Sequence, residues 1–267
     1  MPGSSSIELA DGAEIAYELV GSGPPLVFVA GLGDDRTLFE PLVDVLADRH
    51  TCLSFDNRGS GTSSAPPNPC TLGARADDAS ELARALGLTP AVVVGCSMGG
   101  AIAQEWALGR PDEVTGLVLF NTWARADTHM RLLLEHWTAL SRDGNDARLL
   151  ESLLLFCLSP HYLRQNPGAV EEFLAEPSPA GEGFELQAAA CLGHDILPRE
   201  PIGAPTLIIG GRNDAVVSVE SIEELASAIP GAQLHLLDTG HVAFWERLAH
   251  SITLLRDFVA RLDGPQH

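Results

Sequence analysis

The residues Gly95-Cys96-Ser97-Met98-Gly99 form the pattern G-x-S-x-G, which can present a serine hydroxyl for attack on a substrate. The apolar run at residues 91–94 predicts a strand before the pattern, and helical spacing begins at Met98. A serine on a sharp strand-to-helix turn occupies strained backbone, and glycines on either side let neighbouring chain approach. We therefore predict that Ser97 is a nucleophile at the amino end of a helix, where the helix dipole favours developing negative charge.

A serine hydroxyl is a weak nucleophile and needs a general base, which is most often a histidine. Of the nine histidines, His241 follows the last predicted strand and precedes the predicted C-terminal helix. Asp214 likewise follows a predicted strand, in the sequence GGRND at residues 210–214. Both should lie at the carboxyl edge of a parallel sheet, where ligands bind. We predict a triad in which Asp214 orients His241 and His241 activates Ser97.

Acyl chemistry also needs donors for the developing oxyanion. One predicted donor is the backbone N–H of Met98, the residue after the nucleophile. The second is the N–H of Leu32, in the glycine-containing loop at residues 30–33 that follows the predicted strand at residues 26–29.

Strand-like and helix-like segments alternate over most of the chain, which predicts an α/β fold with a mostly parallel sheet and helices on both faces. A hairpin is expected first, at residues 7–9 and 15–20. The further predicted strands are residues 26–29, 52–55, 91–94, 114–120, 206–209 and 233–237, and the predicted helices are residues 38–46, 72–86, 98–110, 219–229 and 242–262.

Residues 122–204 interrupt this alternation with amphipathic helical stretches and no clear strand. We predict a helical cap (lid) inserted into a core domain formed by residues 1–121 and 205–267. Aromatic and polar side chains of the cap and of the following helix are candidate substrate contacts: Trp123, Arg125, Trp137, His194 and Phe244.

Composition excludes several function classes. The chain has 267 residues, 45% of them hydrophobic, which suffices for one filled core. All 16 basic residues are arginine, so a Schiff-base lysine is excluded, and the net charge of −20 argues against nucleic-acid binding. No apolar run reaches the length of a membrane span and no secretory signal is visible, so we expect a cytoplasmic protein. Five scattered cysteines predict neither a disulfide framework nor a zinc site, and we expect no metal or cofactor, with a small molecule as the partner.

Together these stretches resemble the α/β-hydrolase superfamily over almost the whole chain, and within it the small capped esterase and 3-oxoadipate enol-lactonase-like group. The resemblance is carried by residues 30–33, 55–63, 95–99, 211–214 and 240–241. It implies hydrolysis of a carboxylic ester or lactone through an acyl-enzyme, and it implies that Asp56 and Arg58 are a loop-bracing pair and not catalysts. Two residues depart from the pattern, because relatives usually carry histidine at Ala30 and histidine, tryptophan or asparagine at Cys96.

Three functions are considered first; a cofactor-free haloperoxidase or dehalogenase is a further alternative, and the aspartate that dehalogenases normally place where Ser97 stands argues against the dehalogenase. The first is hydrolysis of an ester or lactone of a small apolar or cyclic metabolite. The second is a lyase on the same scaffold that eliminates an acyl group as a carboxylic acid in bacterial natural-product (polyketide) biosynthesis, a hypothesis prompted by Ala30, Cys96 and the lysine-free, arginine-rich composition. The third is a binding protein that keeps the triad without turnover.

Overall fold

The computed structural model describes residues 5–64 and 71–262, so Cys70 lies outside the described residues. Its centre is an eight-stranded sheet with the order β1-β2-β4-β3-β5-β6-β7-β8. The strands β3 to β8 run parallel. The strands β1 and β2 form the predicted hairpin at the edge of the sheet and pair antiparallel with each other, and β2 also pairs antiparallel with β4. The bounds are β1 (Ser5–Glu8), β2 (Glu14–Gly21), β3 (Pro25–Val29), β4 (Thr51–Phe55), β5 (Ala91–Cys96), β6 (Val114–Phe120), β7 (Thr206–Gly211) and β8 (Gln233–Leu237).

The central strands β3, β5 and β6 are buried on both faces over most of their length, which explains their largely apolar sequences; Thr115 near the start of β6 is an exposed exception. Alternate residues of a strand point to opposite faces. Val27, Val93 and Leu117 therefore join one core cluster, while Phe28, Val94 and Val118 join the other. The predicted α/β architecture is confirmed.

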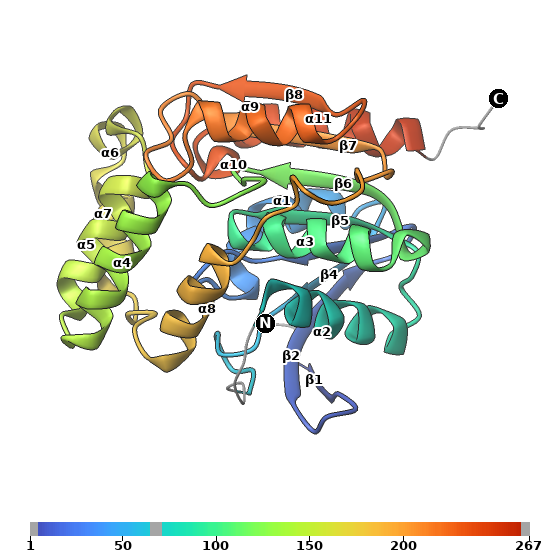
Figure 1. Cartoon of the computed structure of the whole chain (residues 1–267), viewed down its shortest axis with the longest axis horizontal. Coiled ribbons are helices and arrows are strands. Elements are labelled where there is room, and N and C mark those ends of the chain that lie inside the picture. Colours follow the sequence, from blue (N-terminus) through green and yellow to red (C-terminus); the bar gives the residue numbers. More distant parts are fainter. Residues whose placement is uncertain (1–4, 65–70, 263–267) are drawn as a thin grey trace.

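Helices cover both faces of the sheet (Figure 1). The first core cluster contains residues of α2 (Leu72–Ala85), α3 (Met98–Gly109) and α9 (Val219–Ala228). The second contains residues of α1 (Glu40–Leu46), α10 (Ala243–Glu246) and α11 (Leu248–Leu262). The prediction of one continuous helix over residues 242–262 is wrong, because Arg247 takes φ −136° and ψ 53°, outside the helical region, and separates α10 from α11.

Five helices lie between β6 and β7, and we call residues 122–204 the helical insertion. They are α4 (Thr128–Arg142), α5 (Asp146–Cys157), α6 (Pro160–Gln165), α7 (Pro167–Ala175) and α8 (Glu182–Leu192). Figure 1 shows α4 to α7 beyond the carboxyl ends of the strands. The helical stretches expected here from the sequence, residues 130–140, 147–158, 170–174 and 184–191, did not include α6. Ser159 nevertheless caps the first turn of α6 by accepting the N–H of Tyr162, and Pro160 stands at its first position, both ordinary start signals.

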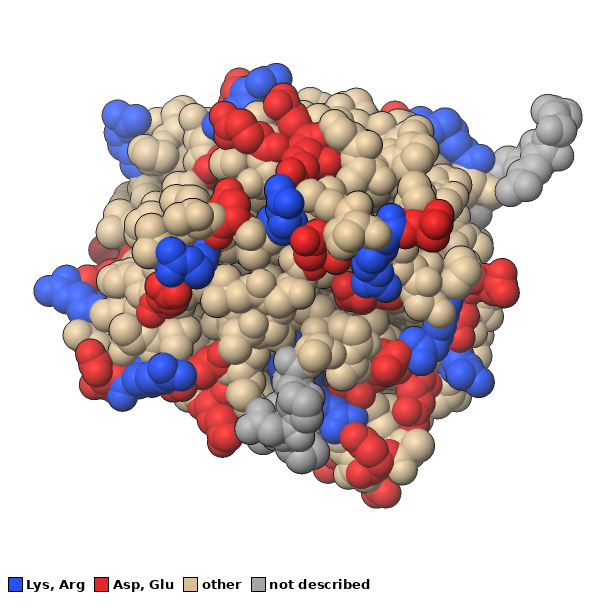
Figure 2. All heavy atoms as spheres, viewed as in Figure 1, with Lys and Arg blue, Asp and Glu red and all other residues tan. Residues whose placement is uncertain are grey.

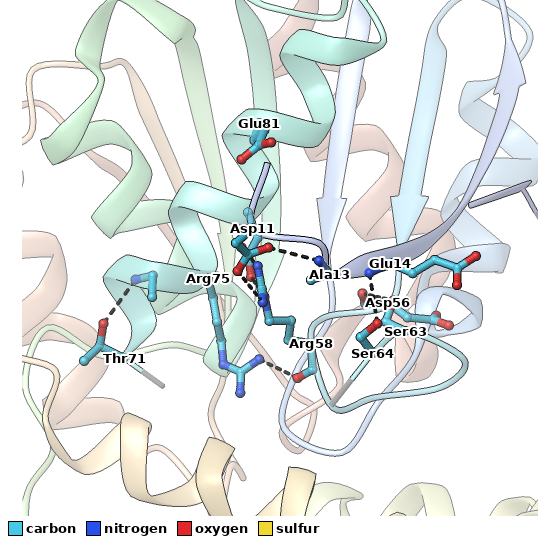
Figure 3. Close-up of polar contacts among 12 residues, drawn as sticks. Asp11, Ala13, Glu14, Asp56, Arg58, Ser63, Ser64, Thr71, Arg75 and Glu81 are labelled. Carbon is cyan, nitrogen blue, oxygen red and sulfur yellow. Dashed lines mark hydrogen bonds and ion pairs between the residues drawn. The ribbon is translucent and has the colours of Figure 1, made fainter. Parts of the chain in front are cut away.

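The loop after β4 is braced by charged side chains, as the resemblance implied, but Asp56 and Arg58 have separate partners. Asp56 accepts hydrogen bonds from the backbone N–H groups of Arg36 and Thr62, both at 2.9 Å, and pairs with the Arg36 guanidinium. Arg58 pairs with Asp78 at 2.6 Å and with Asp11 at 2.8 Å, and Figure 3 shows Asp11 and Arg58 facing each other. These contacts fix the start of the loop beside β3.

Arginines lie among acidic side chains over the face shown in Figure 2, which carries no continuous basic area. Two of the surface ion pairs join Arg125 to Glu224 at 3.0 Å and Arg142 to Glu185 at 2.7 Å. Over residues 5–64 and 71–262, no helix has the length and apolar character needed to cross a membrane. The described cysteines Cys52, Cys96, Cys157 and Cys191 are free thiols.

Candidate active site

Ser97 stands between β5 and α3 in a conformation that is uncommon for a residue with a side chain, with φ 54° and ψ −120°. Hydrogen bonds on both sides hold it there: its N–H donates to Phe120 O at 2.9 Å, and its carbonyl accepts Thr122 Oγ1 at 2.8 Å. Every other residue from 91 to 100 is buried, whereas Ser97 is partly exposed. The turn therefore presents this one side chain outside the core.

The glycines on either side of Ser97 have no room for a side chain. A Cβ on Gly95 would stand 2.3 Å from Gly99 O, and a Cβ on Gly99 would stand 1.9 Å from Val29 O. Both contacts are with backbone, which cannot move aside without displacing the turn or β3. The sharp turn at Ser97 thus depends on the two glycines of the G-x-S-x-G pattern.

The structure brings His241 and Asp214 together, with 2.9 Å between Nδ1 and Oδ2. The Asp214 side chain is fully buried and that of His241 is 6% exposed. The second carboxylate oxygen of Asp214 accepts the N–H groups of Val216 at 2.8 Å and Val217 at 2.9 Å, so its orientation is fixed. With Asp214 ionised, the arrangement assigns the Nδ1 proton to His241 and leaves Nε2 free to accept a proton.

Asn121, at the end of β6, is a further member of this group that the sequence analysis passed over because it is not a carboxylate. Its Nδ2 donates to Asp214 Oδ2 at 2.9 Å and to Gly240 O at 3.2 Å. Its φ of 46° lies in the left-handed region, which asparagine tolerates better than most residues. An asparagine directly after a buried strand, at the same sheet edge as Asp214 and His241, is the sequence signal that could have identified it.

The loop after β3 lies against Ser97. A Cβ on Gly31 would stand 3.6 Å from Ser97 Cβ. Asn57 Nδ2 donates to Ala30 O at 3.0 Å and so braces the loop from the β4 side. Within residues 5–64 and 71–262, the backbone N–H groups of Leu32 and Met98 have no hydrogen-bond acceptor. Two unpaired donors next to a serine are what an oxyanion requires.

The helical insertion is fastened to the loops on both sides of Ser97. On one side, Gln187 of α8 is fully buried, and its Oε1 accepts the N–H of Gly33 at 3.0 Å. On the other side, the N–H of His241 donates to Cys157 O at 2.7 Å. Helix α5 ends at this cysteine, so its last carbonyl holds the backbone of the histidine.

Glu246 of α10 adds a second link between the insertion and the histidine loop. Its Oε1 accepts the N–H groups of Ser159 at 2.8 Å and of Gly240 at 3.0 Å. Its Oε2 accepts the Ser159 hydroxyl at 2.6 Å. One carboxylate therefore joins the start of α6 to the residue before His241.

The predicted substrate contacts lie in several different environments. Phe244 is buried between Phe39 and Phe120, with ring centroids 5.1 and 5.0 Å away. Arg125 is ion-paired with Glu224 at the surface. The other three are buried, with Trp137 donating to Ser152, His194 bonded to Gln104 and Glu105, and Trp123 packed edge-on to His194. Contact of these five residues with a substrate stays a prediction.

The two thiols close to the site are un-ionised. Burial raises the pKa of Cys96 and of Cys157 well above the usual range, and the neighbouring negative charges of Asp34 and Asp214 raise both further. A thiol is far less nucleophilic than a thiolate. The environment of Cys96 therefore disfavours it as the attacking group beside Ser97.

Comparison with known proteins shows the family. Residues 24–248 match the family model of the alpha/beta hydrolase fold. A protein of Azorhizobium caulinodans that is named as a carbamate hydrolase, RutD, is 30% identical over 236 residues, covering 87% of this chain and 89% of its own. The chain therefore belongs to the α/β-hydrolase fold family, as its sequence motifs led us to expect.

Solved structures of related proteins superpose on nearly the whole chain. An enol-lactonase from Burkholderia xenovorans superposes with a TM-score of 0.88 at 26% identity, covering 96% of this chain and 100% of that one. A thermophilic esterase from Thermogutta terrifontis gives a TM-score of 0.85 at 28% identity, covering 98% and 100%. The protein is a hydrolase-type enzyme on the α/β-hydrolase scaffold.

Proposed function

We propose that the protein hydrolyses a carboxylic ester or lactone through an acyl-enzyme on Ser97. His241 takes the hydroxyl proton as Ser97 attacks the carbonyl carbon, and Asp214 stabilises the imidazolium. The N–H groups of Leu32 and Met98 bind the oxyanion. His241 then gives its proton to the leaving alcohol oxygen, and water releases the acid from Ser97 by the same steps in reverse order.

The observation that carries the proposal is the Ser97 turn, together with the 2.9 Å bond between His241 and Asp214. A residue that hydrogen bonds on both sides hold in a strained conformation points to a functional role for its side chain. The unpaired N–H groups of Leu32 and Met98 supply the remaining element of acyl transfer. Relatives named as an esterase, an enol-lactonase and a carbamate hydrolase make esters, lactones and carbamates the compounds to test. We further propose that the helical insertion caps this site.

Labelling with a fluorophosphonate tests the nucleophile without knowledge of the substrate. We expect stoichiometric labelling that maps to Ser97 and is lost in Ser97→Ala. Cys96→Ala is the matched control, because it changes the adjacent side chain and should still be labelled. An unlabelled wild-type protein, or labelling that survives Ser97→Ala, would refute the proposal.

Isotope labelling distinguishes hydrolysis from the elimination reaction that the sequence left open. Turnover of an ester in ¹⁸O-water should place ¹⁸O in the released acid, because water attacks the acyl carbon. Elimination breaks the alkyl–oxygen bond instead, and the acid then keeps only its original oxygens. An unlabelled acid would therefore support the lyase reaction.

A further inference from the structure

A second carboxyl group, Asp34, lies beside the proposed nucleophile and has no part in the triad. The point at which a Cβ on Gly31 would stand is 2.7 Å from Asp34 Oδ2 and 3.6 Å from Ser97 Cβ. The absence of a side chain at Gly31 therefore leaves space for the Asp34 carboxyl next to Ser97. The triad does not use it, since His241 Nδ1 is bonded to Asp214.

Asp34 is partly buried, yet its carboxyl oxygens accept no hydrogen bond from any residue in 5–64 or 71–262. The charges that act on it are those of His241 and Asp35, and no arginine is among them. Its neighbour Asp35 differs, because the Asp35 side chain accepts the Thr37 N–H and hydroxyl. A partly buried carboxyl group whose oxygens have no protein donor is free to accept a hydrogen bond from a ligand.

We propose that Asp34 is a specificity-determining residue that accepts a hydrogen bond from an ammonium or hydroxyl group adjacent to the carbonyl under attack. The same position disfavours a substrate that carries a carboxylate there, because two negative charges would meet without an intervening arginine. This inference rests on the proposed role of Ser97. It narrows the substrate class to neutral or cationic acyl compounds with a donor next to the reacting carbon.

The electrostatic setting agrees with this assignment. Burial raises the pKa of Asp34 from 3.8 to about 7, the positive charge of His241 opposes the rise, and Asp35 adds to it. An ammonium group at Asp34 would favour the ionised carboxylate and bind by a charge-assisted hydrogen bond. A carboxylate at the same place would require Asp34 to remain protonated.

Boronic acids test the inference without turnover, because they add to an active serine and mimic the tetrahedral adduct. The two probes are 1-aminoethylboronic acid and its apolar isostere isopropylboronic acid. Their dissociation constants are measured through protection of Ser97 from fluorophosphonate labelling, in the wild type, Asp34→Asn and Asp35→Asn. Each protein's preference is the ratio of its two constants, which cancels general effects on the adduct.

We expect the wild-type preference for the amino compound to exceed that of Asp34→Asn by about tenfold or more, the typical effect of a hydrogen bond to a charged group. Asp35→Asn should keep the wild-type preference. Equal preferences in the wild type and Asp34→Asn, with normal fluorophosphonate labelling of both, would overturn the inference alone. Absence of labelling in the wild type would overturn the role of Ser97 itself, and with it the inference.

Discussion

At the scale of single residues, the pairing of His241 with Asp214 is supported by Asn121. The Asn121 amide is a donor to the carboxylate oxygen that also faces the imidazole. The same amide also donates a hydrogen bond to the carbonyl of Gly240, the residue before His241. We assign Asn121 a positioning role, since it acts on His241 through these two groups.

Substitution of Asn121 by glycine tests this role, because glycine accepts the φ of 46° and removes only the amide. We expect the rate of Ser97 labelling by a fluorophosphonate to fall about tenfold, as a hydrogen bond to a charged acceptor is lost. Asn121→Asp is the isosteric comparison and should lose more, because it places a second negative charge beside Asp214. An unchanged labelling rate in Asn121→Gly would contradict the positioning role.

At the scale of elements, the sequence predicted well what parallel strands dictate. Strands that are buried on both faces are recognisable in the sequence as apolar runs. The residues that follow parallel strands lie at one edge of the sheet, which identified Ser97, Asp214 and His241 as candidates. Contacts made across the fold left no such signal. Gln187 bonds to Gly33 across 154 residues and Glu246 bonds to Ser159 across 87, and neither pairing follows from local spacing.

Glu246 offers a test of the link between the insertion and the histidine loop. Glutamine can replace it, since its oxygen can accept the N–H groups of Ser159 and Gly240 and its amide can donate to the Ser159 hydroxyl. Alanine leaves both N–H groups without an acceptor. We expect Glu246→Ala to lower the free energy of unfolding by about 2 kcal/mol and to slow Ser97 labelling, with Glu246→Gln close to wild type.

Denaturant unfolding and labelling kinetics of the two variants check this expectation. If alanine and glutamine at position 246 behave alike in both measurements, the carboxylate does not position the histidine loop. If only stability differs, Glu246 fastens the insertion without affecting His241.

At the scale of the whole molecule, we expect Asp34 to make the free energy of unfolding depend on pH. Its folded-state pKa of about 7 lies above the ordinary 3.8, so between these values the native chain keeps a proton that the unfolded chain has lost. Stability from this group therefore falls as pH rises through that window, and the loss is complete above it. Asp34→Asn replaces the titrating carboxyl group with an amide, so this contribution to the pH dependence of stability is lost.

We expect Asp34→Asn to gain stability relative to wild type as pH rises from 5 to 8, measured as the difference in unfolding free energy. Asp35→Asn is the control and should show no such trend. A difference between wild type and Asp34→Asn that stays constant over this range would mean that Asp34 ionises normally in the folded protein.

The two attachments of residues 122–204 also bear on how such an enzyme changes its substrate. One insertion contributes the acceptor for Gly33 and the acceptor for the N–H of His241, on opposite sides of Ser97. Under the proposed role of the insertion as a cap, a chimera that received this segment from a relative would change the residues facing the substrate and the supports of Gly33 and His241 together. We therefore expect exchange of the segment to change substrate selectivity and reaction rate together, unless the exchange keeps Gln187 and the backbone position of the residue 157 carbonyl.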